Sequence, residues 1–378
     1  MKNHKPPFRI VITGGHLTPA IATITALQRR DLSVRIYFIG RDKVSDSQET
    51  KSHEKEAMKE LGVSFLSLTT GRLTKAGSLV EIVSSLIKVP IGFCMAFWYL
   101  LTIRPDAIVS FGGYIAVPIV IVGWVMGIPI ITHEQTQSVG LGTKIIALFS
   151  NVVCVSDPTQ VQSFPFVRSV YTGLPLRDVI VSAAKELKYK KAKHSRPCIL
   201  ITGGTTGALS INTVVYDALP QLLCIANVVH QVGAMSIMHA RQIQNTLHKK
   251  STYVYTCIEY LRESDYVSLL QKSDVVVGRS GANTVAEVAA LAKSAILIPL
   301  PWASFDEQYK NAEVLQKAGS ASILPQKDLT RSTLVSLVTR HIEKRDMYEA
   351  HAKVFAKSVR LDAAELLCDE IIFLVRTV

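Results

Sequence analysis

The sequence lacks the cysteine spacing of a metal-binding or disulfide-rich protein. Its six cysteines are scattered along 378 residues, and no two of them form a Cys-x-x-Cys pair. Most lie in apolar runs typical of strands or helices, so we expect reduced core thiols in a cytoplasmic protein. They are Cys94, Cys154, Cys198, Cys224, Cys257 and Cys368.

An export signal is also missing at the N-terminus. The segment MKNHKPPFRIVITGG passes from a basic start into a short β-branched run. It has neither the long apolar stretch nor the small-residue cleavage site of a signal peptide. We therefore expect the protein to stay in the cytoplasm.

Several nucleotide motifs are absent. The chain contains no Asp-x-Asp pair, no G-x-G-x-x-G fingerprint and no P-loop. These absences disfavour a dehydrogenase and predict no protein-bound metal, although free magnesium could still assist. The charge of a diphosphate would then be met by helix N-termini, arginine and backbone donors.

The composition is that of a globular protein with an anionic partner. Hydrophobic residues make up 48% of the chain and charged residues 19%, with a formal net charge of +12. This length favours two domains with a ligand cleft between them. Nucleoside diphosphates and acidic lipids suit the charge, whereas no nucleic-acid-binding motif accompanies it, so we expect no nucleic acid.

Two long apolar stretches raise the question of membrane contact. Residues 107–132 carry no charge but are punctuated by glycine and proline, which predicts a buried strand, a turn, a helix and a second buried strand. Residues 86–103 carry one charge and include Trp98 and Tyr99, aromatic residues favoured at membrane interfaces. This second stretch is therefore our candidate for contact with one membrane leaflet.

Both halves of the chain begin in the same way. Residues 9–13 (RIVIT) form a predicted strand that stops at Gly14 and Gly15 before a helix over 20–29. Residues 198–202 (CILIT) repeat this pattern before a glycine turn and a helix over 208–219. Further apolar strands alternate with helices, which predicts an α/β protein with two Rossmann-like doubly wound domains facing a cleft.

The domain division is expected near a change of composition. After Arg177 comes the basic segment KELKYKKAKHSRP at residues 185–197, typical of a solvated surface helix or loop and also suited to phosphate or lipid headgroups. We place the hinge towards the start of this region. The predicted N-terminal domain is 1–176 and the predicted C-terminal domain is 177–354.

Each glycine turn that leads into a helix is a candidate anion site. Glycine lets the backbone approach a phosphate, and the free N–H groups of the helix attract it. A third candidate is VVVGRSGANTVAEVAA, in which Thr284 and Glu287 share one helix face. Glu287 could accept hydrogen bonds from ribose hydroxyls, although a helix cap with a solvated glutamate would show the same pattern.

Several of these blocks resemble the MurG family of UDP-N-acetylglucosamine transferases. GRSGANTVAEVA followed by FDEQYKNAEVLQKAG is similar to that family, as are SFGGYIAVP, GIPIITHEQ, TGLPLR and ITGGTTGA in the same order. The resemblance covers almost the whole chain. It implies a GT-B fold in which the C-terminal half binds the nucleotide sugar and the N-terminal half binds a lipid-linked acceptor, with residues 355–378 packing back on the N-terminal half.

The resemblance also implies roles for individual residues. The expected donor-binding residues are Arg177, Thr205, Ala282, Thr284, Glu287, Gln308 and Asn311. The expected acceptor and phosphate-binding residues are Thr13, Gly14, Gly15, His133, Gln135 and Thr136.

Inversion at an anomeric carbon requires a base to take the acceptor hydroxyl proton. His16 is the first candidate and Glu134 the second, although a histidine after a turn is more often structural or phosphate-binding. Two departures from the family pattern concern the acceptor side. The first glycine run is shortened, and Thr136 replaces an asparagine, which removes an amide with both donor and acceptor capacity.

The resemblance implies a peripheral enzyme on the cytoplasmic face of the bacterial inner membrane. It would transfer N-acetylglucosamine from its UDP carrier to the 4-hydroxyl of undecaprenyl-pyrophosphoryl N-acetylmuramyl-pentapeptide for peptidoglycan synthesis, with an anionic membrane surface as a further partner. One alternative is a nucleotide-sugar 2-epimerase of the same fold. Another is a non-catalytic relative that binds a nucleotide sugar or lipid.

Overall fold

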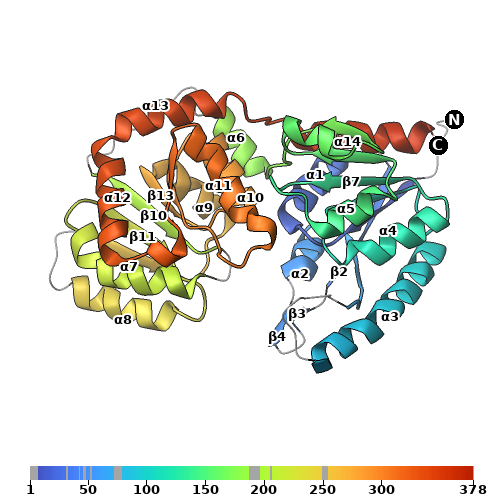
Figure 1. Ribbon diagram of the computed structural model, residues 1–378, viewed down its shortest axis with the longest axis horizontal. Helices are drawn as coiled ribbons and strands as arrows, with labels where there is room; N and C mark the ends of the chain where they lie inside the picture. The colour runs from blue at the N-terminus through green and yellow to red at the C-terminus, as the bar shows by residue number, and fades with distance from the viewer. Residues whose placement is uncertain are drawn as a thin grey trace. The chain divides into compact units, whose positions relative to one another are not determined.

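The computed structural model divides the chain into two compact units (Figure 1). The first holds residues 1–177 and 360–378, and the second holds residues 178–359. The structure describes residues 7–30, 33–41, 43–45, 48–51, 53–71, 79–186, 196–204, 207–248 and 254–377.

The first unit is built on a parallel sheet of seven strands in the order β5-β2-β1-β6-β7-β8-β9. Its residues alternate between two covered faces. Ile10 and Ile12 of β1 pack in one core cluster with α1 and α14, while Val11 packs in another with α3 and α4. The strands are β1 (Phe8–Thr13), β2 (Val34–Gly40), β5 (Ser64–Ser67), β6 (Ala107–Ser110), β7 (Ile130–Glu134), β8 (Val152–Val155) and β9 (Arg168–Tyr171).

Helices cover both faces of this sheet. They are α1 (Leu17–Arg29), α2 (His53–Glu60), α3 (Leu79–Ile103), α4 (Ala116–Val125), α5 (Leu141–Ala147), the short η1 (Pro158–Ser163) and α14 (Ala363–Thr377). A two-stranded antiparallel ribbon of β3 (Lys43–Ser45) and β4 (Gln48–Lys51) lies in the connection from β2 to α2.

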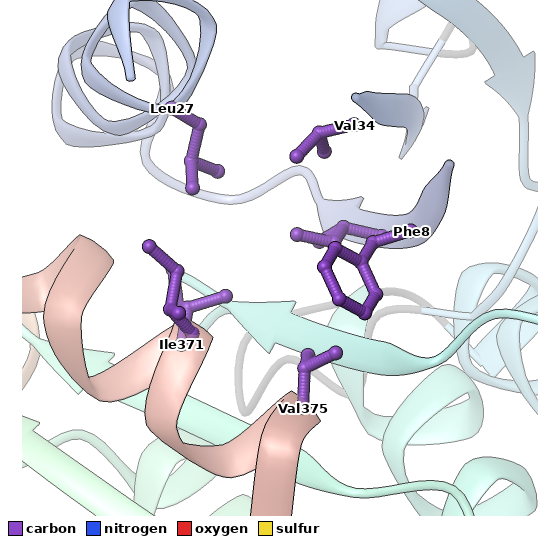
Figure 2. Close-up of a pocket in the computed structure, with 7 residues that line it drawn as sticks. Phe8, Leu27, Val34, Ile371 and Val375 are labelled. Atoms are coloured by element: carbon purple, nitrogen blue, oxygen red, sulfur yellow. The ribbon is translucent and has the colours of Figure 1, made fainter. Parts of the chain in front are cut away.

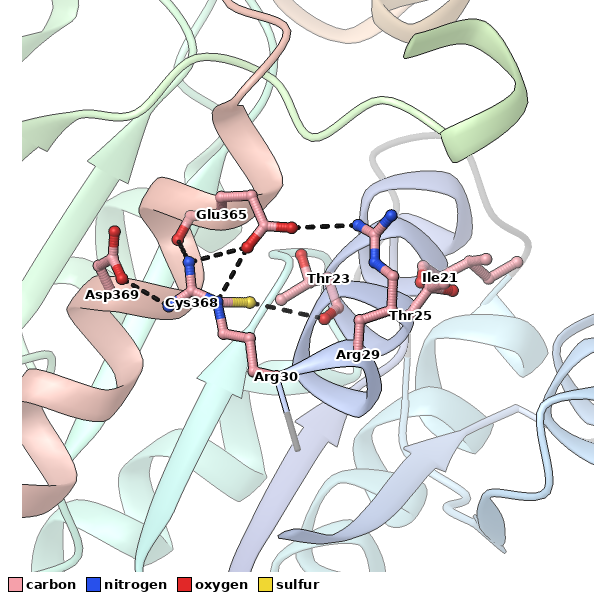
Figure 3. A network of polar contacts seen from close by, with 8 residues as sticks. All are labelled: Ile21, Thr23, Thr25, Arg29, Arg30, Glu365, Cys368 and Asp369. Atoms are coloured by element: carbon pink, nitrogen blue, oxygen red, sulfur yellow. Dashed lines mark hydrogen bonds and ion pairs between the residues drawn. The ribbon is translucent and has the colours of Figure 1, made fainter. Parts of the chain in front are cut away.

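The C-terminal helix α14 packs against α1 in this first unit. Arg30 donates hydrogen bonds to Glu365 and Asp369, and the Cys368 thiol contacts the Thr23 carbonyl (Figure 3). Beside these contacts, a small apolar pocket lies between the starts of β1 and β2 and the helix, lined by Phe8 and Val375 among others (Figure 2). The pocket is thus near the amino ends of these strands, whereas doubly wound sheets bind ligands at the carboxyl ends.

The second unit repeats the architecture with six parallel strands in the order β12-β11-β10-β13-β14-β15. They are β10 (Cys198–Thr202), β11 (Asn227–Gln231), β12 (Tyr255–Ile258), β13 (Val275–Gly278), β14 (Ser294–Leu297) and β15 (Ala321–Ile323). The helices are α6 (Asp178–Glu186), α7 (Leu209–Leu222), α8 (Ile237–His248), α9 (Glu263–Lys272), α10 (Ala282–Ala290), η3 (Ser304–Asp306), α11 (Glu307–Lys317), η4 (Gln326–Asp328), α12 (Arg331–Glu343) and α13 (Arg345–Ala356).

The prediction of two Rossmann-like parallel-sheet units is confirmed, and each unit opens with the expected strand, glycine turn and helix. The structure divides the chain after Arg177 and after Val359, whereas the predicted divisions follow residues 176 and 354. The later division is displaced because α13 continues in the second unit to Ala356. The middle of the basic segment, residues 187–195, lies outside the described residues.

The two apolar stretches form different kinds of structure. Residues 107–132 contain strand β6, helix α4 and part of strand β7, as predicted. Residues 86–103 belong to the single helix α3, which passes through Pro90. All six cysteines are free, but Cys94 and Cys224 are exposed, so the expectation of core thiols is wrong for these two.

Candidate functional site

In each unit several of the predicted site residues lie near the point where the strand order reverses. In the first unit this place is the carboxyl edge at β1 and its neighbour β6, and in the second it is the edge at β10 and its neighbour β13. Loops that leave adjacent strands in opposite directions at such a point open a crevice for ligands. We describe the two edges separately.

The glycine turn after β1 packs directly on the turn after β6. Gly15 has φ +140°, and a Cβ atom built on it would lie 2.4 Å from the carbonyl oxygen of Gly112. Any side chain at Gly15 would therefore force the two turns apart. Thr13, at the end of β1, is fully buried and its hydroxyl oxygen has no hydrogen-bond partner in the described structure.

His16 follows this turn and is oriented by a backbone carbonyl. Its Nδ1 lies 2.8 Å from the carbonyl oxygen of Phe111, the first residue after β6. Because a carbonyl oxygen only accepts, Nδ1 carries the proton, and in the neutral ring Nε2 keeps a free lone pair. The predicted base therefore has the tautomer that a proton acceptor needs.

His133 of β7 is a neutral, buried histidine. Its Nε2 donates to the carbonyl oxygen of Gly173 at 2.9 Å, and its Nδ1 is buried without a hydrogen-bond partner in the described structure. Burial lowers the pKa of His133 to about 4. This ring is thus uncharged near neutral pH and lies beneath the surface of the site.

Glu134, the second predicted base, is held by the residue that departs from the family pattern. Its Oε1 accepts a hydrogen bond from the backbone N–H of Thr136 at 2.9 Å, and the Thr136 hydroxyl lies 2.8 Å from the same oxygen. That hydroxyl also lies 2.6 Å from the carbonyl oxygen of Ser138. Thr136 therefore contacts the carboxylate directly, and the side-chain oxygen of the neighbouring Gln135 is buried without a partner in the described structure.

A buried carboxylate that the sequence analysis did not select lies beside the first glycine turn. Glu54 of α2 accepts a hydrogen bond from the backbone N–H of Arg41 at 2.8 Å. A Cβ atom built on Gly14 would lie 3.0 Å from its Oε2. Glu54 was missed because it sits in a polar stretch far along the chain, and only the end of β2 brings it to Gly14.

In the second unit the glycine turn joins β10 to α7. Gly204 has φ +82° and Gly207 has φ +78°, conformations that favour glycine. Among the described residues, no atom lies within 4 Å of a Cβ position on Gly204. Thr205, the predicted diphosphate contact, lies outside the described residues.

The turn after β13 leads into α10 and contains a glycine and a buried serine. Gly281 is the N-cap, and no atom of the described residues lies within 4 Å of a Cβ position on it. The Ser280 hydroxyl is fully buried and has no hydrogen-bond partner in the described structure. A helix start with free N–H groups, beginning at Ala282, and an unsatisfied hydroxyl beside it suits an anionic group.

Four further predicted donor residues lie on α10 and α11: Thr284, Glu287, Gln308 and Asn311. Thr284 is half-buried and Glu287 is 4% exposed, one turn further along α10. The side-chain oxygen of Gln308 accepts from the backbone N–H of Leu300 at 3.0 Å, which leaves its amide nitrogen to donate elsewhere. Asn311 is buried and donates to the carbonyl oxygen of Ser280 at 3.2 Å, so it fixes the turn before α10.

Arg177 and Arg279 lie in different units. Arg177, a predicted donor contact, is the last residue of the first unit before α6. Arg279 follows β13 and donates to the carbonyl oxygens of Ile298 and Pro299. It also donates to the Ser210 hydroxyl at 2.9 Å and the Gln326 side-chain oxygen at 2.7 Å. These four acceptors are neutral, so the arginine keeps its positive charge beside the starts of α7 and α10.

Two family models match the chain. The glycosyltransferase family 28 N-terminal domain matches residues 11–155, and the glycosyltransferase family 28 C-terminal domain matches residues 198–367. A UDP-N-acetylglucosamine--N-acetylmuramyl-(pentapeptide) pyrophosphoryl-undecaprenol N-acetylglucosamine transferase 2 of Bacillus cereus is 30% identical over 359 residues, covering 92% of this chain and 95% of the relative. The corresponding transferase of Treponema pallidum is 32% identical over 333 residues, 86% of this chain and 84% of the relative.

Solved structures share the fold across the chain. The MurG structure from Acinetobacter baumannii has a TM-score of 0.73 and 24% identity, covering 97% of this chain and 99% of its own. A UDP-GlcNAc 2-epimerase from Neisseria meningitidis, bound to UDP-GlcNAc, has a TM-score of 0.64 and 15% identity, covering 96% and 99%. At these identities the structural likeness shows the fold alone.

Proposed function

Since the chain belongs to the MurG family of glycosyltransferase family 28, we propose that it transfers N-acetylglucosamine from UDP-N-acetylglucosamine to lipid-linked N-acetylmuramyl-pentapeptide. The acceptor is the 4-hydroxyl of the muramyl sugar on undecaprenyl pyrophosphate, and the product serves peptidoglycan synthesis. The observation that carries the proposal is the 30% identity that spans both units.

The first unit would supply the acceptor site and the base. With Nδ1 engaged by the Phe111 carbonyl, His16 Nε2 is free to accept the proton of the attacking hydroxyl. The new glycosidic bond forms at the anomeric carbon on the face opposite the leaving group as the bond to UDP breaks, which inverts that carbon. Glu134 is the alternative base, since only one of its carboxylate oxygens is engaged by Thr136.

The second unit would hold the nucleotide sugar. We assign the diphosphate to the glycine turn before α7 and the start of α10, where the Ser280 hydroxyl is unpartnered in the described structure. Glu287 would accept hydrogen bonds from the ribose hydroxyls, and Gln308 would meet the sugar. Helix N-termini and the Arg279 charge would stabilise the departing UDP, so we expect no protein-bound metal ion to be required.

The helix α3 would bind the enzyme to a membrane surface. Its stretch Ser85–Ile103 is long and apolar enough to cross a bilayer by length and composition, and 22% of that stretch is buried. One face is exposed and apolar, including Ile87, Trp98 and Leu101, and the opposite face packs through Leu100 on the sheet. A helix with one face in the fold suits peripheral binding in the interface, which we place at the cytoplasmic face of the bacterial inner membrane.

One reaction tests this proposal against the two alternatives. Purified enzyme is incubated with labelled UDP-N-acetylglucosamine and the lipid-linked muramyl-pentapeptide, and the lipid fraction is analysed for a labelled disaccharide. We expect labelled disaccharide lipid only when both substrates are present. Conversion of the donor to its C2 epimer without acceptor would establish the epimerase instead, and donor binding with no product in either assay would establish the non-catalytic relative.

A further inference from the structure

Two polar residues end a strand that is otherwise part of the second unit's core. His230 and Gln231 are the last residues of β11, and their exposed fractions are 0% and 4%. Burying two polar side chains costs stability unless each is hydrogen-bonded. Their partners all belong to the glycine turn before α7 or to segments that support it.

Gln231 closes a ring of hydrogen bonds around Gly204. The Thr202 hydroxyl donates to Gln231 Oε1 at 3.1 Å and accepts from the backbone N–H of Gly204 at 3.2 Å. The Gln231 amide nitrogen donates to the carbonyl oxygen of Gly204 at 3.3 Å. Both polar groups of this glycine are therefore bound by side chains from two neighbouring strands.

The ring fixes the direction in which the Gly204 carbonyl points. That oxygen accepts from Gln231 and also from the backbone N–H of Gly207 at 3.1 Å, so it is turned into the fold. A carbonyl oxygen turned the other way would repel an anionic group. No atom of the described residues lies within 4 Å of the position that a Cβ atom on Gly204 would occupy, so these residues leave room for a ligand there.

A second set of hydrogen bonds holds the base on which the turn lies. A Cβ atom on Gly207 would lie 2.2 Å from the carbonyl oxygen of Val232, so the turn rests directly on the residue after β11. Asn212 of α7 donates to that same oxygen at 2.9 Å. His230 Nε2 lies 3.1 Å from Asn212 Oδ1, and its Nδ1 lies 3.2 Å from the Tyr255 hydroxyl.

The protonation of this set follows from its partners. The Asn212 amide nitrogen donates to Val232 and to the Ser236 hydroxyl, so Asn212 Oδ1 must accept from His230 Nε2. His230 Nδ1 is then the acceptor for Tyr255. Burial lowers the pKa of His230 to about 3, which keeps this arrangement unchanged near neutral pH.

We propose that Gln231 is a positioning residue for the donor diphosphate, acting through Gly204, with Thr202 as its partner. Gln231 touches neither substrate in this role: it keeps the Gly204 carbonyl away from the phosphate oxygens. The inference rests on the proposed function, because it takes the glycine turn before α7 as the diphosphate site. It predicts a defect that depends on the phosphate groups of the ligand.

The experiment compares three ligands that all contain uridine. Two of them also carry a diphosphate, and the third carries no phosphate. UDP-N-acetylglucosamine, UDP and uridine are titrated calorimetrically into the full-length enzyme and into Gln231→Met. Methionine keeps the side-chain length and removes both hydrogen bonds. We expect UDP and UDP-N-acetylglucosamine to bind roughly fivefold to tenfold more weakly, with uridine unchanged.

The matched control is Gln244→Met. Gln244 lies in the same unit and also binds a backbone group through its side chain, accepting from the Cys257 N–H at 2.9 Å, away from the glycine turn. We expect this variant to bind all three ligands like the wild type. We also expect Thr202→Val combined with Gln231→Met to bind UDP no more weakly than Gln231→Met, because the two residues act on the same glycine.

The outcomes separate this inference from the proposed function. Equal UDP affinity in wild type and Gln231→Met, or an equal loss for uridine and UDP, would overturn the positioning role. A wild type that binds UDP but transfers no sugar would overturn the proposed reaction, and the same titrations would still decide the role of Gln231. A wild type that binds no UDP would overturn both.

Discussion

The two units repeat one scaffold with different residues after the glycine turn. Each has a glycine turn after its first strand at the point where the strand order reverses. In the first unit the turn leads to His16, whose ring is oriented to accept a proton, and in the second it leads to the start of α7 with no titratable residue in the first turn. One structural feature, repeated in the two units, thus presents a histidine in the first unit and a helix start without titratable side chains in the second.

The surfaces differ as well as the sites. In the first unit α3 exposes Ile87, Trp98 and Leu101 on one face. Among the described residues of the second unit no helix is long and apolar enough to cross a membrane. The unit that would meet a lipid-linked acceptor is thus also the unit with the apolar face.

Replacing His16 should produce the largest effect. His16→Gln removes the free ring nitrogen, and we expect kcat to fall about 100-fold to 10,000-fold because proton transfer loses its acceptor. Donor affinity should stay at the wild-type value, since His16 lies in the first unit. Steady-state kinetics and donor titration check both; a small loss in His16→Gln beside a large one in Glu134→Gln would move the base to Glu134.

Replacing Glu287 should weaken donor binding by the second unit. Glu287→Ala and the isosteric Glu287→Gln remove a charged hydrogen-bond acceptor from α10, and we expect about tenfold to 100-fold weaker binding of UDP-N-acetylglucosamine. Turnover at saturating donor should change far less. Calorimetry measures donor affinity, and kcat measures turnover at saturating donor. Wild-type donor affinity in both variants would exclude Glu287 from the ribose site.

The exposed face of α3 gives a smaller predicted effect. Trp98 is 66% exposed, and Trp98→Ala should weaken binding to vesicles containing anionic lipid roughly tenfold, because less apolar surface enters the interface. Phe166 is 92% exposed in the same unit but lies off α3, so Phe166→Ala is the control and should bind like the wild type. Vesicle sedimentation measures both. Equal binding by wild type and Trp98→Ala would place membrane contact elsewhere.

Acidification should have the smallest effect, a gradual loss of folding stability. The pKa of His230 is lowered to about 3 and that of His341 to about 4 in the second unit, and the pKa of His133 to about 4 in the first, each mainly by burial. The unfolded chain takes up protons near pH 6.5, so the stability that neutral histidines contribute is present above that pH. It declines as the pH falls towards the folded values, by at most about 1.4 kcal/mol per pH unit for each histidine.

The measurement combines thermal unfolding with histidine NMR between pH 7 and pH 5. We expect the melting temperature to fall by a few degrees per pH unit, with the ring signals of His230 and His341 remaining those of neutral imidazole. Titration of either ring near pH 6.5 would show that this histidine does not cause the loss of stability.

The order of strands and helices could be predicted from the sequence because apolar runs of strand length alternate with helical segments. The edge strands β5, β9 and β15 and the β3–β4 ribbon were not predicted, since short edge segments carry little apolar pattern. Pro90 and Gly92, residues that often end a helix, both lie inside the single helix α3. A Cβ position on Gly92 would lie 2.7 Å from Thr70, so this glycine serves close packing rather than a break.

The candidate site was predicted where a residue type and a turn coincide along the chain. His16, Glu134 and the turn before α10 are of this kind. Glu54 and Gln231 were not predicted, because each reaches a glycine turn from another part of the chain. No local pattern indicates that a polar residue ending a buried strand will bind a glycine from the neighbouring strand.

The amino-acid order alone thus determined the class of fold, the family and the positions of the glycine turns, since these depend on spacing between neighbours in the chain. Only tertiary structure decided which nitrogen of His16 is held by a carbonyl oxygen and what orients Gly204. Hydrogen-bond partners of these groups come from separate strands that meet only when the sheet forms. Their chemistry is therefore a property of sheet register rather than of sequence spacing.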